Sequence, residues 1–164
     1  MFRKRIELKA EEILVSQNIN ESPVPVELIA NQYKIQISRA PNKDFSGLLV
    51  RKEDRSLIGV NSKEPLKRQR FTIAHELGHY FLHPNKNAFV DYRDNQKNII
   101  RGIKEVQANI FAAAMLMPSS FLLEDYKKIS KNGLLEEKDI KLLSDKYQVS
   151  EDAMKIRLIN LHLS

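Results

Sequence analysis

Residues Arg70 to His83 read RFTIAHELGHYFLH, and two histidines inside this stretch stand four residues apart. On an α-helix, residues i and i+4 lie one turn apart on the same face, so His75 and His79 can direct an imidazole nitrogen at the same ion. Glu76 follows His75 directly, so its carboxylate would flank the ion and accept a proton from a water molecule. The HExxH spacing therefore predicts a zinc-peptidase helix, with His75 and His79 as metal ligands and Glu76 as the catalytic base.

Apolar residues surround this motif on nearly all sides, which indicates a buried helix. They are Phe71, Ile73, Ala74, Leu77, Tyr80, Phe81 and Leu82. Gly78 inside the helix costs roughly 1 kcal/mol relative to alanine, so another backbone or a substrate is expected to approach it closely. The alternative is a core helix that carries two ordinary, hydrogen-bonded histidines.

The chain has 164 residues and no cysteine. This length suits one domain with a substantial core. Without cysteine there is no disulfide and no thiolate ligand, so a metal would bind histidine and carboxylate groups. No apolar run is long enough to span a bilayer, and acidic residues from Glu7 to Glu12 interrupt any export signal behind the basic start. We expect a cytoplasmic protein with no membrane segment.

The formal net charge of +6 invites comparison with nucleic-acid-binding proteins. The basic clusters are short, however, and they are separated along the chain and interleaved with acidic residues. A solvated surface explains them better than a continuous phosphate-binding track does. We therefore do not expect direct nucleic-acid binding.

Three segments with strand character precede the motif, at residues 35–38, 47–50 and 57–60, with turn-forming residues between them. We expect an α+β fold that is mainly helical, with a small antiparallel three-stranded sheet before the HExxH helix. An exposed edge of such a sheet can hold a substrate peptide beside the metal.

We expect residues 1–164 to form a single metallopeptidase domain with four parts. These are helices and the small sheet at 1–62, the HExxH helix at 63–83, a helix with the third ligand at 99–117, and a helix pair at 136–161. The polar segment 85–98 has little periodicity and is either a lid over the site or a plain linker.

The predicted helix at 99–117 supplies the candidate for a third metal ligand. Glu105 is an acid among mainly apolar residues, and the small residues Ala108 and Ala112 share its face. Alone, such an acid is more often a surface feature or a partner of the helix dipole. A catalytic zinc usually takes three protein ligands, which favours Glu105 once two histidines are present. Asn109, one turn later, could orient a ligand or be an ordinary buried amide.

Other histidines fit the metal site less well. His83 lies one turn beyond His79, and a straight helix cannot easily bring three successive turns to one ion. His83 is therefore expected to end the helix or line the cleft. The metzincin pattern requires a glycine and a third histidine where this chain has Leu82 and Asn85. His162 stands far along the chain and has no supporting neighbours.

The last two predicted helices, at about 136–147 and 151–161, have the outline of a helix-turn-helix. Ser150 is placed to cap the second of them. As a DNA reader this pair would have few polar contacts, chiefly Lys155, Arg157 and Asn160. Packing against the catalytic core is the favoured role.

Several blocks of the chain together resemble the ImmA/IrrE family of metallopeptidases. The two specific blocks are residues 68–79, RQRFTIAHELGH, and residues 105–113, EVQANIFAA. Weaker similarities are Leu116-Met117-Pro118, residues 24–30, residues 47–61 and the ending at 142–161. A familiar variant of the family has a second acid where this chain has Gln107, which leaves Glu105 as the only carboxylate in its block.

The resemblance implies a zinc-dependent endopeptidase with a compact zincin-like fold and one zinc ion, typically cytoplasmic and bacterial or carried by a mobile element. Its implied substrate is a transcriptional repressor with a helix-turn-helix domain, which is inactivated so that genes are switched on. Carried onto this chain, His75, His79 and Glu105 would be the ligands and Glu76 the base. Two histidines and one carboxylate also suit manganese or iron.

Two other functions stay open from the sequence. The chain could be a metal-binding regulator that sequesters a repressor without cutting it, or a DNA-binding protein that uses its C-terminal helices. For the group that stabilises the oxyanion of peptide hydrolysis, Tyr80, Tyr92 and Tyr126 are candidates by residue type alone.

Overall fold

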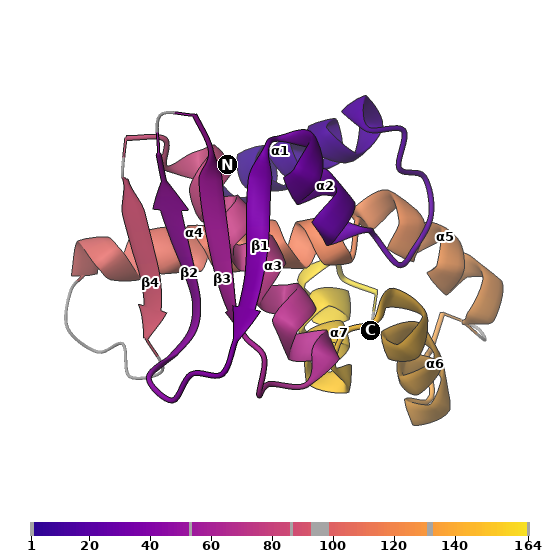
Figure 1. Cartoon of the computed structure of the whole chain (residues 1–164). Coiled ribbons are helices and arrows are strands. Elements are labelled where there is room, and N and C mark those ends of the chain that lie inside the picture. Colours follow the sequence, from indigo (N-terminus) through magenta and orange to yellow (C-terminus); the bar gives the residue numbers. More distant parts are fainter. Residues whose placement is uncertain (1, 53, 86, 93–98, 131–132, 164) are drawn as a thin grey trace.

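The computed structural model describes residues 2–52, 54–85, 87–92, 99–130 and 133–163, and within these ranges the chain forms seven helices and four strands. One sheet lies on one side of the molecule, with helices gathered behind and beside it (Figure 1). Helix α3 (Leu66–Leu82) contacts strands of the sheet, and α4 (Ile99–Leu116) packs against α3. The HExxH helix is thus held between a sheet and a second helix.

The sheet has four strands in the order β1-β3-β2-β4, namely β1 (Ile35–Ala40), β2 (Phe45–Arg51), β3 (Ser56–Asn61) and β4 (Ala88–Tyr92). β1 runs parallel to β3, whereas β2 is antiparallel to both β3 and β4. The prediction of three antiparallel strands is therefore wrong in strand number and in the direction of one pair.

The connection between β1 and β2 accounts for the parallel pair. It reverses the chain without forming a hairpin, and β3 fills the place between the two strands. The buried side chain of Asn61, at the end of β3, ties this connection down. Its Nδ2 donates to the carbonyl of Asn42 at 2.9 Å, and its Oδ1 accepts from the backbone N–H of Asn42 at 3.1 Å. These contacts join segments far apart in sequence, so local periodicity does not reveal them.

β4 occupies part of the segment at 85–98 for which we expected a lid or a linker. Its apolar run is only Ala88-Phe89-Val90, too short to stand out among polar neighbours. Pairing with β2 supplies the hydrogen bonds that make it a strand. The rest of that segment, residues 93–98, lies outside the described residues.

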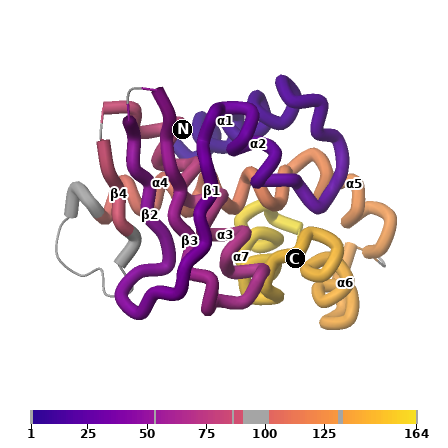
Figure 2. Tube along the Cα trace, viewed as in Figure 1, coloured from indigo at the N-terminus to yellow at the C-terminus, as the bar shows by residue number. Residues whose placement is uncertain are grey.

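The remaining helices lie close to the expected positions, and Figure 2 follows the chain through them. They are α1 (Phe2–Ser16), α2 (Val26–Gln32), α5 (Ser119–Ile129), α6 (Glu137–Tyr147) and α7 (Glu151–Asn160). Ser150 caps α7 as predicted, because its side chain accepts a hydrogen bond from the N–H of Ala153. Gln148 takes the left-handed conformation, with φ 53°, and ends α6.

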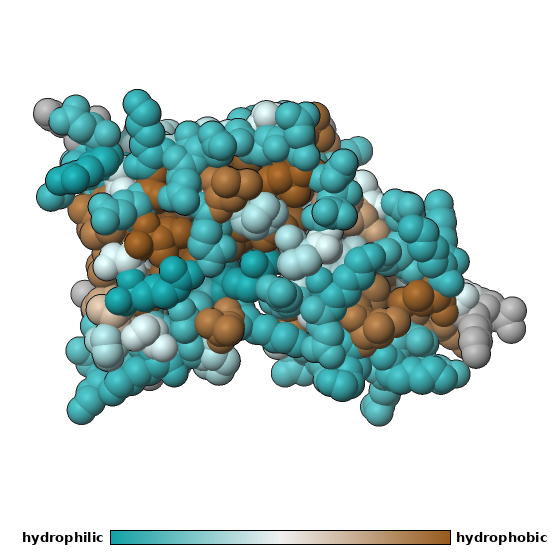
Figure 3. Space-filling view, turned by 45° about the vertical axis from the view of Figure 1, so that its right-hand side comes forward, coloured by the Kyte–Doolittle hydropathy of each residue, from teal (hydrophilic) through white to brown (hydrophobic). Residues whose placement is uncertain are grey.

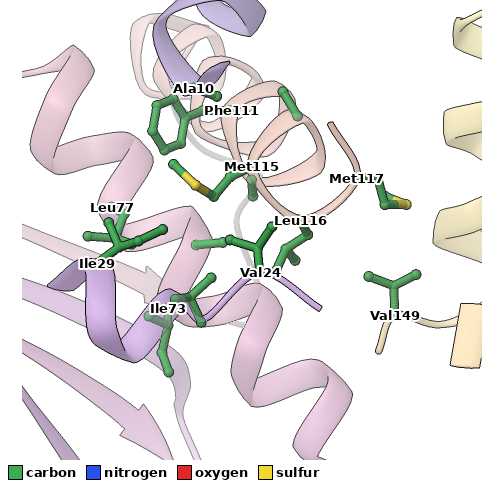
Figure 4. Packing of buried hydrophobic residues seen from close by; sticks show 14 of the residues in the cluster. Ala10, Val24, Ile29, Ile73, Leu77, Phe111, Met115, Leu116, Met117 and Val149 are labelled. Atoms are coloured by element: carbon green, nitrogen blue, oxygen red, sulfur yellow. The ribbon is translucent and has the colours of Figure 1, made fainter. Parts of the chain in front are cut away.

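The hydrophobic core gathers around the inner face of α3. Ile73 and Leu77 of α3 meet Ile29 of α2 on one side and Phe111 and Met115 of α4 on the other (Figure 4). All five side chains are fully buried. Residues flanking the HExxH motif therefore anchor its helix, and this fixes the direction in which the histidines point.

On the face shown in Figure 3, apolar residues form patches between hydrophilic side chains. In the part of the chain that the structure describes, no single helix has both the length and the apolar character needed to cross a membrane. The segments Gly102–Leu116 and Ser119–Ile129 together have the length and composition of a membrane span, but the chain bends by 52° between them.

Candidate metal centre

His75 and His79 converge from successive turns of α3. Their Nε2 atoms are 3.1 Å apart, and the two rings meet edge to face. Both side chains are almost completely buried. Only one of the two facing Nε2 atoms can carry the proton of a hydrogen bond between them. The other Nε2 atom therefore directs a lone pair into the space between the rings. This is the arrangement that the four-residue spacing predicted.

Glu105 reaches the same place from α4. Its Oε2 lies 3.1 Å from Nε2 of His75, and its Oε1 lies 3.5 Å from Nε2 of His79. Within the described residues, His75, His79 and Glu105 form the one group of three potential ligands, and their ligand atoms all lie within 4.8 Å of one another. Two imidazoles and one carboxylate are the donor set of many catalytic zinc sites.

Gly78 makes this meeting of helices possible. A Cβ atom at this position would lie 3.0 Å from Cα and 3.1 Å from the carbonyl oxygen of Ala108. The close approach expected from the sequence is therefore that of the α4 backbone. Ala108 stands one turn after Glu105, so the spacing of α3 and α4 also sets the distance of Glu105 from the histidines.

The charges in the cluster favour metal binding. Burial alone would raise the pKa of Glu105, but its polar contacts with His75 and His79 outweigh burial and hold the pKa well below its ordinary value of 4.5. Burial lowers the pKa of His79 below its ordinary value of 6.5, against an opposing hydrogen bond to Glu105. An ionised carboxylate beside a neutral imidazole is the protonation state in which these groups bind a metal.

Two neighbours orient the histidine rings. Oδ1 of Asn109 lies 2.9 Å from Nδ1 of His75, and an amide oxygen there accepts the Nδ1 proton and leaves Nε2 free to bind a metal. The structure thus gives Asn109 the orienting contact that the sequence left open. The ring of Phe89, from β4, stacks on His79 with centroids 4.1 Å apart and planes at 14°. The sequence did not single out Phe89, because its strand was not predicted.

Glu76 is completely buried and points towards the sheet. A Cβ on Gly47, in β2, would lie 3.0 Å from its Oε1 and would overlap the side chain of Thr72. Only a residue without a side chain fits there, so Gly47 makes the space that the Glu76 side chain occupies between α3 and β2. A glycine inside a predicted strand was the signal for this close approach.

Arg51, at the end of β2, holds the C-terminal end of α3. Its Nη2 donates to the carbonyl oxygens of His79 at 3.0 Å and Tyr80 at 2.6 Å. A cation at this end also complements the helix dipole. The sequence gave no sign of this role, because the contacts join residues nearly thirty positions apart.

Of the other candidate residues, only His83 is next to a ligand within the described residues, with its ring centroid 5.4 Å from that of His79. His83 is the C-cap of α3, and its Nε2 lies 3.4 Å from the carbonyl of Lys104, which agrees with its expected place at the helix end. His162 has a left-handed backbone just beyond α7 and is exposed. Tyr80 lies beneath the guanidinium of Arg51, and the hydroxyl of Tyr126 donates to Gly133. The side chain of Tyr92 lies outside the described residues.

Of the three candidate DNA-contact residues in the C-terminal helix pair, Arg157 turns inwards, whereas Lys155 is exposed. Arg157 is 3% exposed. Its Nε donates to the carbonyl of Met117, and its Nη1 binds the carboxylate of Glu7. This contact joins α7 to the N-terminal helix and to the end of α4, in keeping with the packing role favoured for these helices.

Comparison with known proteins gives similarities over most of the chain. The model of the family described as the IrrE N-terminal-like domain matches residues 30–159. Metallopeptidase ImmA of Bacillus subtilis is 33% identical over 123 residues, which cover 74% of this chain and 68% of that protein. Radiation response metalloprotease IrrE of Deinococcus radiodurans is 32% identical over 81 residues, which cover 49% of this chain and 25% of that protein. This chain therefore spans about two thirds of the first relative and a quarter of the second.

A solved structure named Mycobacterium tuberculosis transcriptional regulator shares the fold. Its TM-score is 0.64 at 18% sequence identity, and the match covers 94% of this chain and 46% of that one.

Proposed function

This chain belongs to the metallo-endopeptidase family of the IrrE N-terminal-like domain, and we propose that it uses one zinc ion to hydrolyse a peptide bond in a partner protein. The observation that carries this proposal is the convergence of His75, His79 and Glu105, whose ligand atoms lie within 4.8 Å of one another, on a helix that also buries Glu76. The family membership expected from the sequence is confirmed. The choice of zinc, the roles of these residues and the substrate are our proposals.

In this mechanism His75, His79 and Glu105 would hold the ion. Bound zinc would lower the pKa of a water molecule towards neutrality and polarise the carbonyl that is attacked. Asn109 keeps the proton of His75 on Nδ1, so that Nε2 faces the site. Glu76 removes a proton from the water at a carboxylate oxygen and later donates it to the leaving nitrogen. Burial beside Gly47 fixes the position of that carboxylate.

We propose that the substrate is a helix-turn-helix transcriptional repressor and that its cleavage relieves repression. The support is the resemblance of residues 68–79 and 105–113 to blocks of the ImmA/IrrE family. A repressor substrate would place the reaction in the cytoplasm of a bacterium. We also propose that residues 1–164 act as one metallopeptidase domain, since a single hydrophobic cluster includes residues from Ile6 to Leu158.

Metal analysis and one isosteric variant test the chemistry. Purified protein should hold about one zinc ion per chain, and Glu105→Ala should lose most of it. Glu76→Gln should keep the zinc and lose turnover of a protein substrate by a factor of about 100 or more, because an amide cannot accept the proton. Turnover near that of the parent would refute the role of Glu76, and a parent that binds no metal would refute the proposal as a whole.

A reporter gene under a candidate repressor tests the substrate. The parent should relieve repression and shorten the repressor, while Glu76→Gln should do neither. Relief by Glu76→Gln without cleavage would show a regulator that sequesters its partner, and the peptidase proposal would then fail.

A further inference from the structure

A groove of about 710 Å³ opens between α3, α4 and α7, and residues next to the proposed metal ligands line it. Asn109 lines this groove and also contacts the ring of His75. Val106, the residue after Glu105, lines it as well. A molecule in the groove would therefore lie along the N-terminal half of α3 and contact Asn109, which holds the Nδ1 edge of the His75 ring.

Large apolar side chains form most of the groove wall. Phe71 comes from α3, Ile110 from α4 and Ile156 from α7. Val106 and Ile156 are 54% and 60% exposed, although both are large aliphatic residues. Exposed aliphatic residues that gather in a concave surface mark binding sites more often than convex, scattered ones do.

The groove carries an excess of positive charge. Four of its lining residues are cations, Arg3, Lys67, Arg68 and Arg157, and one, Asp152, is an anion. Asp145 binds Lys67 at 2.8 Å, and Glu7 binds the buried Arg157. Arg3 and Arg68 are exposed, and Nε of Arg68 lies 3.8 Å from the mostly buried carboxylate of Glu64. An acidic side chain that approaches the groove would thus meet two exposed positive charges.

We propose that this groove docks an apolar segment of the protein substrate that is flanked by acidic residues. This inference rests on the proposed peptidase function and names the chemistry by which the substrate is selected. Aliphatic side chains of the substrate would pack against Ile156, Val106 and Phe71, and acidic neighbours would meet Arg3 and Arg68. The docked segment would hold an adjoining stretch of the substrate beside Glu76.

Peptide binding to the Glu76→Gln variant tests the groove without any turnover. The probe is a short fluorescein-labelled peptide with leucines on one helical face and glutamates at both ends, followed by fluorescence anisotropy. It should bind more tightly, by a factor of about ten or more, than a version with serine for leucine or one with lysine for glutamate. Added salt should weaken binding of the glutamate peptide.

The chain offers matched control variants. Ile156 and Ile159 stand on the same helix and are both 60% exposed, but only Ile156 lines the groove. Ile156→Glu should weaken binding of the glutamate peptide by a factor of about ten or more, and Ile159→Glu by less than about twofold. Val106 and Ile103 form a second pair on α4, both 54% exposed, and Val106→Ser alone should weaken binding.

Cleavage of the same peptides by the parent separates this inference from the proposed function. Groove-dependent binding without any cleavage would refute the peptidase and leave the docking surface. Binding and cleavage that Ile156→Glu leaves unchanged would overturn the docking inference and leave the peptidase. Light scattering tests whether the groove instead binds a second copy of this chain. If the parent is a dimer that Ile156→Glu dissociates and Ile159→Glu does not, and if peptide binding is unchanged, the groove is a dimer interface. That result would also overturn the inference.

Discussion

Gly78→Ala should destabilise the protein although alanine is the better helix former. In an isolated helix the change would gain about 1 kcal/mol. Here the new methyl group would meet the α4 backbone at 3.0 Å from Cα and 3.1 Å from the oxygen of Ala108, and Cβ of Phe111 at 3.2 Å. Backbone atoms cannot turn aside as a side chain does, so α4 must move, at a cost of about 1–3 kcal/mol. The expected net loss is about 1 kcal/mol in the free energy of unfolding, measured by urea titration.

Gly102→Ala is the matched control. Gly102 is an exposed residue of α4, and a Cβ there would meet nothing within 4 Å. This change should stabilise the protein by up to about 1 kcal/mol. The two variants should therefore differ by about 2 kcal/mol, or roughly 4–8 °C in Tm for a chain of this size.

Metal affinity gives a second measurement of the same movement. Gly102 precedes Glu105 by three residues, and Ala108 follows it by three, so both glycine variants concern the helix turn that holds the ligand. Gly78→Ala should weaken zinc binding because α4 moves away, whereas Gly102→Ala should leave it unchanged. If Gly78→Ala proved as stable as Gly102→Ala and bound zinc equally well, the contact with Ala108 would not set the helix spacing, and the reasoning would be wrong.

Three further outcomes are expected. Gly47→Ala should lower stability by about 1–3 kcal/mol and reduce turnover more than zinc content, because the added Cβ crowds Glu76; equal losses of both would contradict this. Asn109→Ala should weaken zinc binding by about 10–100-fold in competition with a chelator, since the His75 ring loses its partner. In the metal-free protein, the lowered pKa of His79 means that unfolding takes up a proton, so the free energy of unfolding should fall as the pH is lowered from about 7.5 to 5.5. Urea titrations should show a smaller pH dependence in His79→Gln, and an unchanged one would count against this assignment.

Local sequence patterns were sufficient for the two helices that carry the site. The helical period places His75 and His79 on one face, and the apolar neighbours of the motif show that the helix is buried. The same period sets Asn109 one turn after Glu105. The sequence therefore allowed two interpretations of Asn109, a residue that orients a ligand or an ordinary buried amide, and its contact with His75 agrees with the first. The spacings of His75 from His79 and of Glu105 from Asn109 are four residues each, and hydrogen bonds within each helix fix the geometry of such a spacing.

The sheet could not be derived in the same way. Alternating apolar residues indicate a strand but not its neighbour, so the parallel pairing of β1 with β3 was missed. β4 was not predicted, because three apolar residues give no clear period. For the same reason Phe89 of β4, which stacks on His79, was not predicted as a neighbour of the site. Its pairing with β2 depends on hydrogen bonds to a strand far away in sequence.

The sequence by itself thus determined the family, the two site helices and the residue types that can bind a metal. Tertiary structure decided how far Glu105 stands from the histidines, because that distance depends on the contact of Gly78 with Ala108. It also decided that Gly47 leaves room for Glu76, that Arg51 holds the end of α3, and that a groove opens between α3, α4 and α7. The physical reason is that helix geometry is set by neighbours along the chain, whereas the spacing between elements is set by side chains and backbones that meet only after folding.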